Sequence, residues 1–257
     1  NRYPGWYSAD PQGMGAVLDR LHARYPKVPM SVTEYGAGGA LTQHTDNPAG
    51  GPINAFGRPH PEGYQSWVHE QNSKALESRR YLWATWVWNM FDFASDFRTE
   101  GDAIDLNDKG LVTFDRKVRK DAFFFYKANW STAPVLHLNG SRHVVRPYPA
   151  ADISVYSNAS EATLAVNGVK IGQQPCPDRI CLWRNVALAP GQNQIVASAT
   201  IGGVPATAAM ELTGPDPART GLRINAGDLT SMTLPDGRHF GSDHFFSGGE
   251  AKALNSR

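Results

Sequence analysis

The sequence lacks several features that would assign it to a broad class at once. No apolar run approaches the roughly 20 residues that a membrane-spanning helix needs. The 25 Lys and Arg residues are balanced by 24 Asp and Glu residues, which gives a net charge of +1. This balance provides neither the basic footprint of a nucleic-acid-binding protein nor a polybasic membrane patch. We therefore expect no nucleic-acid partner and no membrane partner.

Short motifs for metals and nucleotides are also missing. The chain contains no His-Glu-x-x-His, P-loop or Gly-x-Gly-x-x-Gly motif, and its histidines show no convergent ligand spacing. We therefore expect no metal and no cofactor. The first residues, "NRYPGWYSAD", have neither an initiating Met nor the pattern of a signal peptide. The chain is accordingly expected to be a piece of a longer protein.

Cysteine is scarce, with only Cys176 and Cys181, which lie close together in "PCPDRICLW". Two cysteines around a Pro-Asp turn could close a small disulfide loop in an exported protein. They could equally be two ordinary thiols, and a single Cys-x₄-Cys pair is a poor zinc motif. Both interpretations stay open at this point.

The first part of the chain alternates helical and strand patterns. Apolar residues at helical spacing predict helices over 10–26, 60–80 and 119–130, and apolar runs predict buried strands over 28–36 and 81–91. This alternation indicates an α/β arrangement with parallel strands. Two strands and three helices are too few to close a barrel.

The pattern changes near residue 131. From 133 to 213, short alternating strands are separated by Asn-Gly, Pro-Gly and Gly-Gly turns, which predicts a small immunoglobulin-like β-sandwich. A Pro-rich linker, "GPDPART", precedes a last segment that begins a further β module. The expected fold class is thus α/β followed by all-β, with domains at 1–131, 132–214 and 215–257. The five expected sandwich strands are "HVVRPY", "ADISVYSN", "ATLAVNG", "CLWRNVAL" and "NQIVASATI".

One acid lies at an informative position. In "SVTEYGAGG", Glu34 comes at the end of a predicted strand and just before a glycine-rich loop. Catalytic groups often occupy junctions of this kind. A lone acid at a strand end is nevertheless more often half of an ion pair, so the flanking segments have to decide its role.

Three segments together resemble the catalytic barrel of glycoside hydrolase family 2, the family of β-galactosidases, β-glucuronidases and β-mannosidases. They are "NRYPGWY", "TEYG" and the long segment from "WVWNMFDF" to "FFFYKANW". The resemblance implies that residues 1–131 are the C-terminal part of a (β/α)₈ TIM barrel, and that the sandwich is the immunoglobulin-like domain that follows it. The last segment looks like the start of a malectin-like carbohydrate-binding module.

The resemblance also implies roles for individual residues. Glu34 aligns with the catalytic nucleophile, and Tyr3 with a tyrosine that hydrogen-bonds it. Trp88 matches an indole that lines the apolar face of the sugar, whereas Trp83 and Trp86 of the same cluster are expected in the core. Asn107 and Lys109 fall in the loop that closes over the far side of the sugar. No metal site is implied.

One departure from the family pattern concerns the acid/base residue. In the family this is a Glu preceded by Asn, and no Asn-Glu pair occurs in the chain. A retaining glycosidase needs two carboxylates about 5–5.5 Å apart. We therefore expect the chain to be inactive alone and to need a missing N-terminal portion of the same enzyme.

The resemblance leads to a first functional expectation, a retaining exo-β-galactosidase that acts on terminal β-galactosides. A β-glucuronidase of the same family is the alternative, because an Asn-x-Lys such as Asn107–Lys109 can hold a uronate carboxylate. A non-catalytic carbohydrate-binding fragment is the rival from another class. We expect a periplasmic or secreted location, and an oligomer is compatible with this interpretation.

Overall fold

The computed structural model describes residues 3–8, 10, 13–51 and 53–245. By its internal contacts the chain divides into two compact units. The first comprises residues 1–43, 47–120 and 245–257, and the second comprises 44–46 and 121–244. Each unit is described by itself below. None of the described helices is long and apolar enough to cross a membrane.

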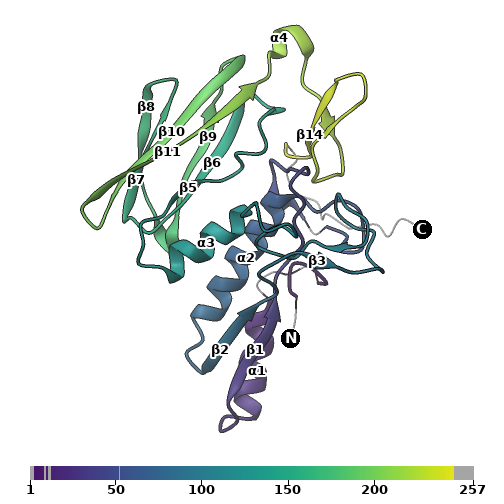
Figure 1. Cartoon of the computed structure of the whole chain (residues 1–257), viewed down its shortest axis with the longest axis vertical. Helices are drawn as coiled ribbons and strands as arrows, with labels where there is room; N and C mark the ends of the chain where they lie inside the picture. Colours follow the sequence, from purple (N-terminus) through teal and green to yellow (C-terminus); the bar gives the residue numbers. More distant parts are fainter. Residues whose placement is uncertain (1–2, 9, 11–12, 52, 246–257) are drawn as a thin grey trace. The chain divides into compact units, whose positions relative to one another are not determined.

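The first unit is built around a strand–helix–strand motif (Figure 1). Strand β1 (Met30–Tyr35) and strand β2 (Leu82–Val87) pair in parallel, with Met30 opposite Leu82 and Tyr35 opposite Val87. Parallel neighbours need a crossover connection, which helix α2 (Glu62–Glu77) provides. The remaining elements are α1 (Gly13–Arg24), the 3₁₀ turn η1 (Pro48–Gly50) and a short antiparallel pair, β3 (Phe93–Ala94) and β4 (Leu106–Asn107).

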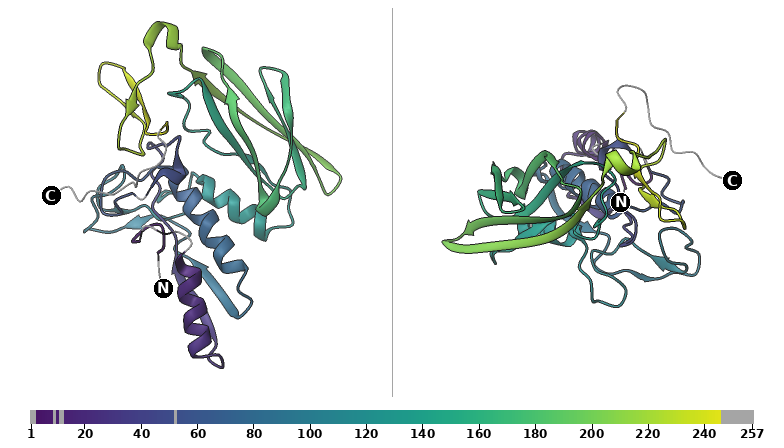
Figure 2. Two further views of the ribbon diagram at one scale, coloured as in Figure 1. Left: turned by 180° about the vertical axis from the view of Figure 1, so that it is seen from behind. Right: turned by 90° about the horizontal axis from the view of Figure 1, so that it is seen from above.

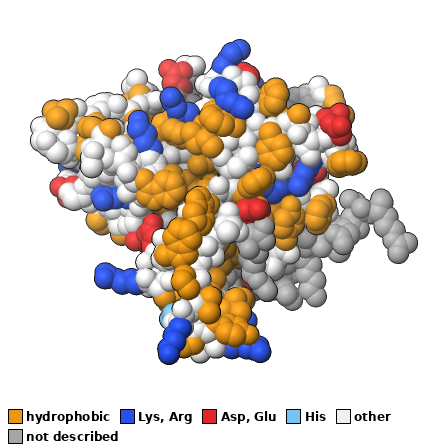
Figure 3. Space-filling model, turned by 60° about the horizontal axis from the view of Figure 1, so that its bottom comes forward, with side chains coloured by type: hydrophobic (Ala, Val, Ile, Leu, Met, Phe, Trp, Pro, Cys, Tyr) orange, Lys and Arg blue, Asp and Glu red, His pale blue; other side chains and the backbone are white. Residues whose placement is uncertain are grey.

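The strand–helix–strand motif leaves hydrophobic side chains on its surface. Trp83 and Trp86 of β2 are 65% and 45% exposed, so the expectation that they belong to the core is wrong for the described chain. Among the described strands β2 pairs with β1 alone, and the described chain packs too little against the faces of this two-stranded sheet to cover the two rings. Figure 3 turns this part of the molecule forward and shows hydrophobic side chains gathered on it.

The second unit is a two-sheet sandwich. One sheet has the strand order β11-β10-β7-β8 and the other has the order β5-β6-β9. The strands of the two sheets can be followed in Figure 2. The apolar core lies between the sheets and includes Ile153, Leu164, Trp183, Ile195 and Leu212. The strands of the sandwich are β5 (Leu136–Leu138), β6 (Ala150–Ser157), β7 (Glu161–Val166), β8 (Val169–Pro175), β9 (Ile180–Ala187), β10 (Gly191–Ile201) and β11 (Val204–Gly214).

Smaller elements flank the sandwich. Helix α3 (Asp121–Trp130) precedes it, and the 3₁₀ turn η2 (Pro177–Arg179) lies in the loop that the Cys176–Cys181 disulfide closes. The structure thus adopts the bridged alternative for the two cysteines. A short helix and three short strands follow: α4 (Pro217–Thr220), β12 (Ile224–Asn225), β13 (Met232–Thr233) and β14 (His239–Ser242).

The unit boundary falls between Lys120 and Asp121, so α3 groups with the sandwich. Asp121 is buried at the start of this helix, where its carboxylate accepts hydrogen bonds from His137 at 2.8 Å and from the backbone N–H of Gly140 at 2.7 Å. The sequence placed the change of pattern near residue 131. The assignment of domains at 1–131, 132–214 and 215–257 stays a prediction.

Candidate active site

The structure places the two predicted catalytic residues against each other. Glu34 is the fifth residue of β1 and is half-buried, and the Tyr3 hydroxyl donates a hydrogen bond to its Oε2 at 2.6 Å. Burial, together with this hydrogen bond, raises the pKa of the Tyr3 hydroxyl well above its usual range. Tyr3 therefore stays a proton donor toward Oε2 and leaves Oε1 without this hydrogen bond.

The turn that carries Tyr3 is fixed by helix α2. Tyr64 donates its hydroxyl proton to the Gly5 carbonyl at 2.5 Å, and the Asn72 amide donates to the Pro4 carbonyl at 3.1 Å. Both side chains are buried. A cavity of about 540 Å³ opens beside this turn and is lined in part by Tyr3, Tyr7 and Met14. Helix α2 thus holds the turn of Tyr3, and Tyr3 itself borders the cavity.

Trp88 follows β2 directly. Its backbone N–H donates to the Tyr35 carbonyl at 2.8 Å, which ties it to the residue after Glu34. Its ring is half-buried and meets the Phe93 ring edge to face at 6.0 Å. The backbone therefore brings Trp88 to the same end of the sheet as the predicted nucleophile, and its sugar-stacking role stays a prediction.

Asn107 ends β4, and Lys109 lies two residues later in the buried loop that follows. The side-chain oxygen of Asn107 accepts a hydrogen bond from the Lys109 backbone N–H at 3.2 Å. Lys109 is 2% exposed, and its Nζ lies 5.4 Å from the Trp6 ring centroid and 5.6 Å from that of Tyr7. Among the described residues no acceptor lies within 3.5 Å of this ammonium in hydrogen-bond geometry, and the Tyr7 hydroxyl is the polar group beside it that favours its charged form. Burial nevertheless lowers the pKa of Lys109.

Tyr7 and Arg98 complete a cationic cluster that the sequence reasoning missed. Burial opposes ionisation of the Tyr7 phenol, yet the neighbouring Lys109 and Arg98 lower its pKa overall. Arg98 itself forms an ion pair with the buried Glu100. We call Tyr7, Arg98 and Lys109 the cationic cluster. The presence of Tyr7 four residues after Tyr3 in "NRYPGWY" was the only signal that could have pointed to it.

Ring contacts join this cluster to the predicted nucleophile. The Tyr3 and Tyr7 rings meet edge to face, with centroids 5.3 Å apart. The site thus runs from Glu34 through Tyr3 and Tyr7 to Lys109. A carboxylate at one end and a buried ammonium at the other could engage a substrate that carries an electrophilic carbon and a separate anionic group.

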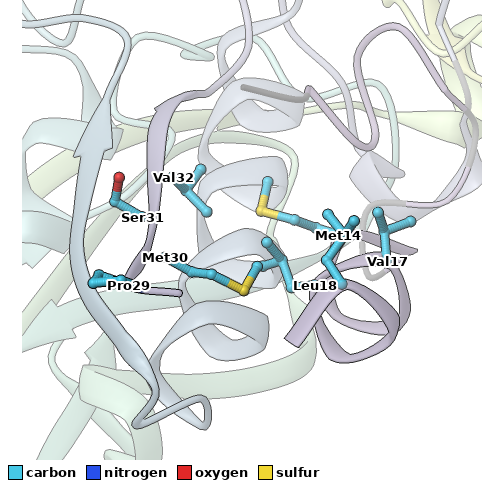
Figure 4. Close-up of a pocket in the computed structure, with 8 residues that line it drawn as sticks. Met14, Val17, Leu18, Pro29, Met30, Ser31 and Val32 are labelled. Atoms are coloured by element: carbon cyan, nitrogen blue, oxygen red, sulfur yellow. The ribbon is translucent and has the colours of Figure 1, made fainter. Parts of the chain in front are cut away.

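A second cavity shares Met14 with the first. It measures about 380 Å³ and is lined mainly by apolar side chains of α1 and β1, including Leu18, Met30 and Val32 (Figure 4). None of its lining residues is titratable, so we do not assign the reaction to it. Across the described part of the chain, no three His, Cys, Asp or Glu side chains come together as metal ligands would.

Comparison with known proteins gives matches along most of the chain. Residues 150–205 match the family model described as "Domain of unknown function (DUF4982)". A β-glucuronidase of Bacteroides fragilis is 44% identical over 209 residues, which is 80% of this chain and 30% of that protein.

Solved structures that resemble the chain also include glycosidases. An FMN-binding β-glucuronidase of Faecalibacterium prausnitzii is 37% identical with a TM-score of 0.74, over 83% of this chain and 31% of that one. A putative β-galactosidase of Bacteroides fragilis is 34% identical with a TM-score of 0.77, over 85% of this chain and 33% of that one. The chain spans about 30% of the length of the relatives it matches, and it belongs to glycoside hydrolase family 2.

Proposed function

We propose that this chain carries the nucleophile and the acid-recognition part of a retaining exo-β-glucuronidase. The carrying observation is Lys109, a buried ammonium with no acceptor in hydrogen-bond geometry in the described chain, beside Tyr7 and Arg98. A buried cation is costly unless it is paired. The C6 carboxylate of a glucuronide would supply that pair, whereas the C6 hydroxyl of a galactoside would not.

The proposed reaction is a double displacement. Glu34 Oε1 attacks the anomeric carbon while the bond to the leaving-group oxygen breaks and a second carboxylate protonates that oxygen. Water then hydrolyses the glycosyl–Glu34 ester, and the second carboxylate takes the proton of the water. Tyr3, hydrogen-bonded to Oε2, orients Glu34 throughout.

The remaining assignments belong to the same proposal. The parallel β1–β2 pair with its α2 crossover supports the interpretation of the first unit as part of a (β/α)₈ barrel. The acid/base Glu would come from barrel strands of the longer enzyme that this chain does not supply. The Cys176–Cys181 disulfide supports an exported location, since such bonds persist in oxidising compartments.

The test compares two substrates on the full-length enzyme. We expect faster hydrolysis of nitrophenyl β-glucuronide than of nitrophenyl β-galactoside. Replacing Lys109→Met should lower kcat/KM for the glucuronide roughly 100-fold, because a charge-assisted hydrogen bond is worth about 1.5–3 kcal/mol. The same change should leave the slower galactoside reaction within about 2-fold, since discrimination rests on the lost ion pair.

A β-galactosidase is the second candidate, and the sequence alone favours it over a β-glucuronidase. The solved putative β-galactosidase at 34% identity supports it. Under this alternative the galactoside would be the better substrate and Lys109→Met would change both rates by the same factor. That outcome would overturn the glucuronide proposal while leaving Glu34 as the nucleophile.

A further inference from the structure

A buried imidazole–carboxylate pair lies next to Lys109 of the cationic cluster. His60 Nδ1 and Asp108 Oδ2 are 2.7 Å apart, and the two residues are 0% and 4% exposed. Although burial opposes it, the hydrogen bond from His60 holds the pKa of the Asp108 carboxyl below its usual range. Asp108 is therefore a carboxylate, and it lies next to Lys109 in the chain.

The pair reaches Lys109 by a second route. The His60 ring meets the Trp6 ring edge to face at 4.6 Å, and the Lys109 ammonium lies over that same Trp6 ring. His60 thus touches both the residue before Lys109 and the aromatic surface beneath the ammonium. It therefore contacts two neighbours of the Lys109 ammonium, and both contacts restrict where that ammonium can lie.

Asp108 also joins the loop of the nucleophile to the loop of Lys109. Its backbone carbonyl accepts hydrogen bonds from Gly39 N–H at 3.1 Å and from Lys120 Nζ at 2.8 Å. At Gly38, a Cβ atom would fall 2.4 Å from Asp108 Oδ1 and 2.7 Å from His60 Nδ1. Only glycine therefore allows the loop that follows Glu34 to approach the pair this closely.

From this geometry we infer that His60 and Asp108 are positioning residues that set the Lys109 ammonium for an acidic sugar, and thereby fix the preference for uronates over neutral sugars. The inference rests on the proposed function. Neither residue touches the reacting atoms. Their substitution should consequently change recognition of the carboxylate and leave the displacement chemistry in place.

The experiment uses the full-length enzyme with nitrophenyl β-glucuronide and nitrophenyl β-galactoside. His60→Phe keeps a ring against Trp6 but removes the proton donor to Asp108, and we expect KM for the glucuronide to rise about 10-fold with kcat within about 2-fold. The milder Asp108→Asn keeps the shape and an acceptor for His60, so its effect should be smaller and in the same direction. For both variants kcat/KM for the galactoside should stay within about 2-fold.

A matched control is His69→Phe, which replaces another fully buried imidazole of the same unit. His69 packs near the Tyr35 ring, at a centroid distance of 6.3 Å. A loss caused by damaged packing should lower kcat/KM for both substrates by one common factor.

The outcomes separate the inference from the function it depends on. A wild-type enzyme that does not prefer the glucuronide overturns both. A wild-type preference for the glucuronide, combined with equal losses on the two substrates in His60→Phe and Asp108→Asn, overturns the positioning role alone. A folded His60→Phe enzyme with an unchanged glucuronide KM overturns it as well.

Discussion

The two units fill their interiors with different kinds of side chain. Between the sheets of the second unit the buried residues are apolar, among them Leu164, Ile195 and Leu212. The first unit instead buries charged groups, such as Asp108 and Lys120, around its candidate site. Burial of apolar surface stabilises a fold, whereas each buried charge costs desolvation free energy. The comparison indicates that the sandwich interior serves stability and that the first unit gives up stability for a polar site.

The largest effect should come from the first unit and should concern catalysis. In the full-length enzyme, Glu34→Gln removes the attacking oxyanion and keeps the shape, so kcat should fall roughly 10⁴-fold or more. The midpoint of denaturant unfolding should hardly change. Glu211→Gln, an exposed position on β11, is the control. A mechanism-based fluoro-sugar that labels a different acid would refute the assignment of Glu34.

The next effect should come from the second unit and should concern stability. Ile195 is 0% exposed, and Ile195→Ala should lower the free energy of unfolding by about 2–5 kcal/mol because it leaves a cavity between the sheets. Val169→Ala, at a position 65% exposed, should change it by no more than about 0.5 kcal/mol. Fluorescence of the buried Trp183 can follow unfolding in urea. Equal losses in the two variants would contradict the assigned core.

Asp46 is an exception that sharpens the comparison, because it is a buried carboxyl in the second unit. It faces Arg146 and His143 at 3.7 Å and lies near Ser242 and His244, yet burial dominates and raises its pKa from 3.8 to about 6. A raised folded-state pKa adds stability at low pH that is lost as the pH rises toward 6.

The comparison with Asp46→Asn isolates this effect. Between pH 4 and pH 6 the wild type should lose about 2 kcal/mol relative to the variant, since one pKa unit corresponds to about 1.4 kcal/mol and the loss is completed only above pH 6. His44, whose pKa burial lowers to about 4, titrates in both proteins and cancels in the difference, whereas His143 faces Asp46 and belongs to the effect that is measured. Free energies of unfolding of both proteins, measured at several pH values, give this difference. A wild type that gains stability relative to the variant over this range would mean that Arg146 keeps Asp46 ionised.

The smallest effect concerns the disulfide of the sandwich. The Cys176–Cys181 loop is short, so the chain-entropy model gives a stabilisation of about 2 kcal/mol. The free energy of unfolding of a Cys176→Ala, Cys181→Ala double variant should be lower by this amount than that of the wild type. Reductant should lower the stability of the wild type and leave that of the double variant unchanged. Intact mass after alkylation without reductant is the check. Two freely alkylated thiols would count against both the bridge and an exported location.

Regular periodicity made the three longest helices and the strands β1, β2, β6, β7, β9 and β10 predictable from sequence. The helical spacing of Met14, Leu18 and their neighbours corresponds to α1, and the apolar runs correspond to β1 and β2. The predicted strand "HVVRPY" is wrong. Pro147 has no N–H to donate, so that segment makes only an isolated bridge, through Val145 to Thr213. Strands β5, β8 and β11 were missed, since their residues are short, polar or alanine-rich runs.

Residues of the candidate site could be predicted only where they lie within a motif that resembles the family. The Tyr3–Glu34 contact and the Asn107–Lys109 loop followed from motifs that resemble the family, although their roles remain predictions. The surroundings of Lys109 come from separate segments that hold Trp6, His60 and Arg98, and no spacing in the sequence links these segments. Such contacts depend on how loops pack, which local patterns do not encode.

The membership of residues 44–46 in the second unit has an evolutionary consequence. Asp46 is linked by sequence to the loop after β1, but its partners Arg146, His143 and Ser242 all belong to the second unit. A recombination event that exchanged residues 121–244 as a cassette would leave this tripeptide behind. The sandwich that replaces residues 121–244 would then pack against a His44–Asp46 segment from another protein. The original sandwich, placed in that other protein, would bury Arg146 without the Asp46 carboxyl. Inheritance of the two units is therefore coupled through three residues.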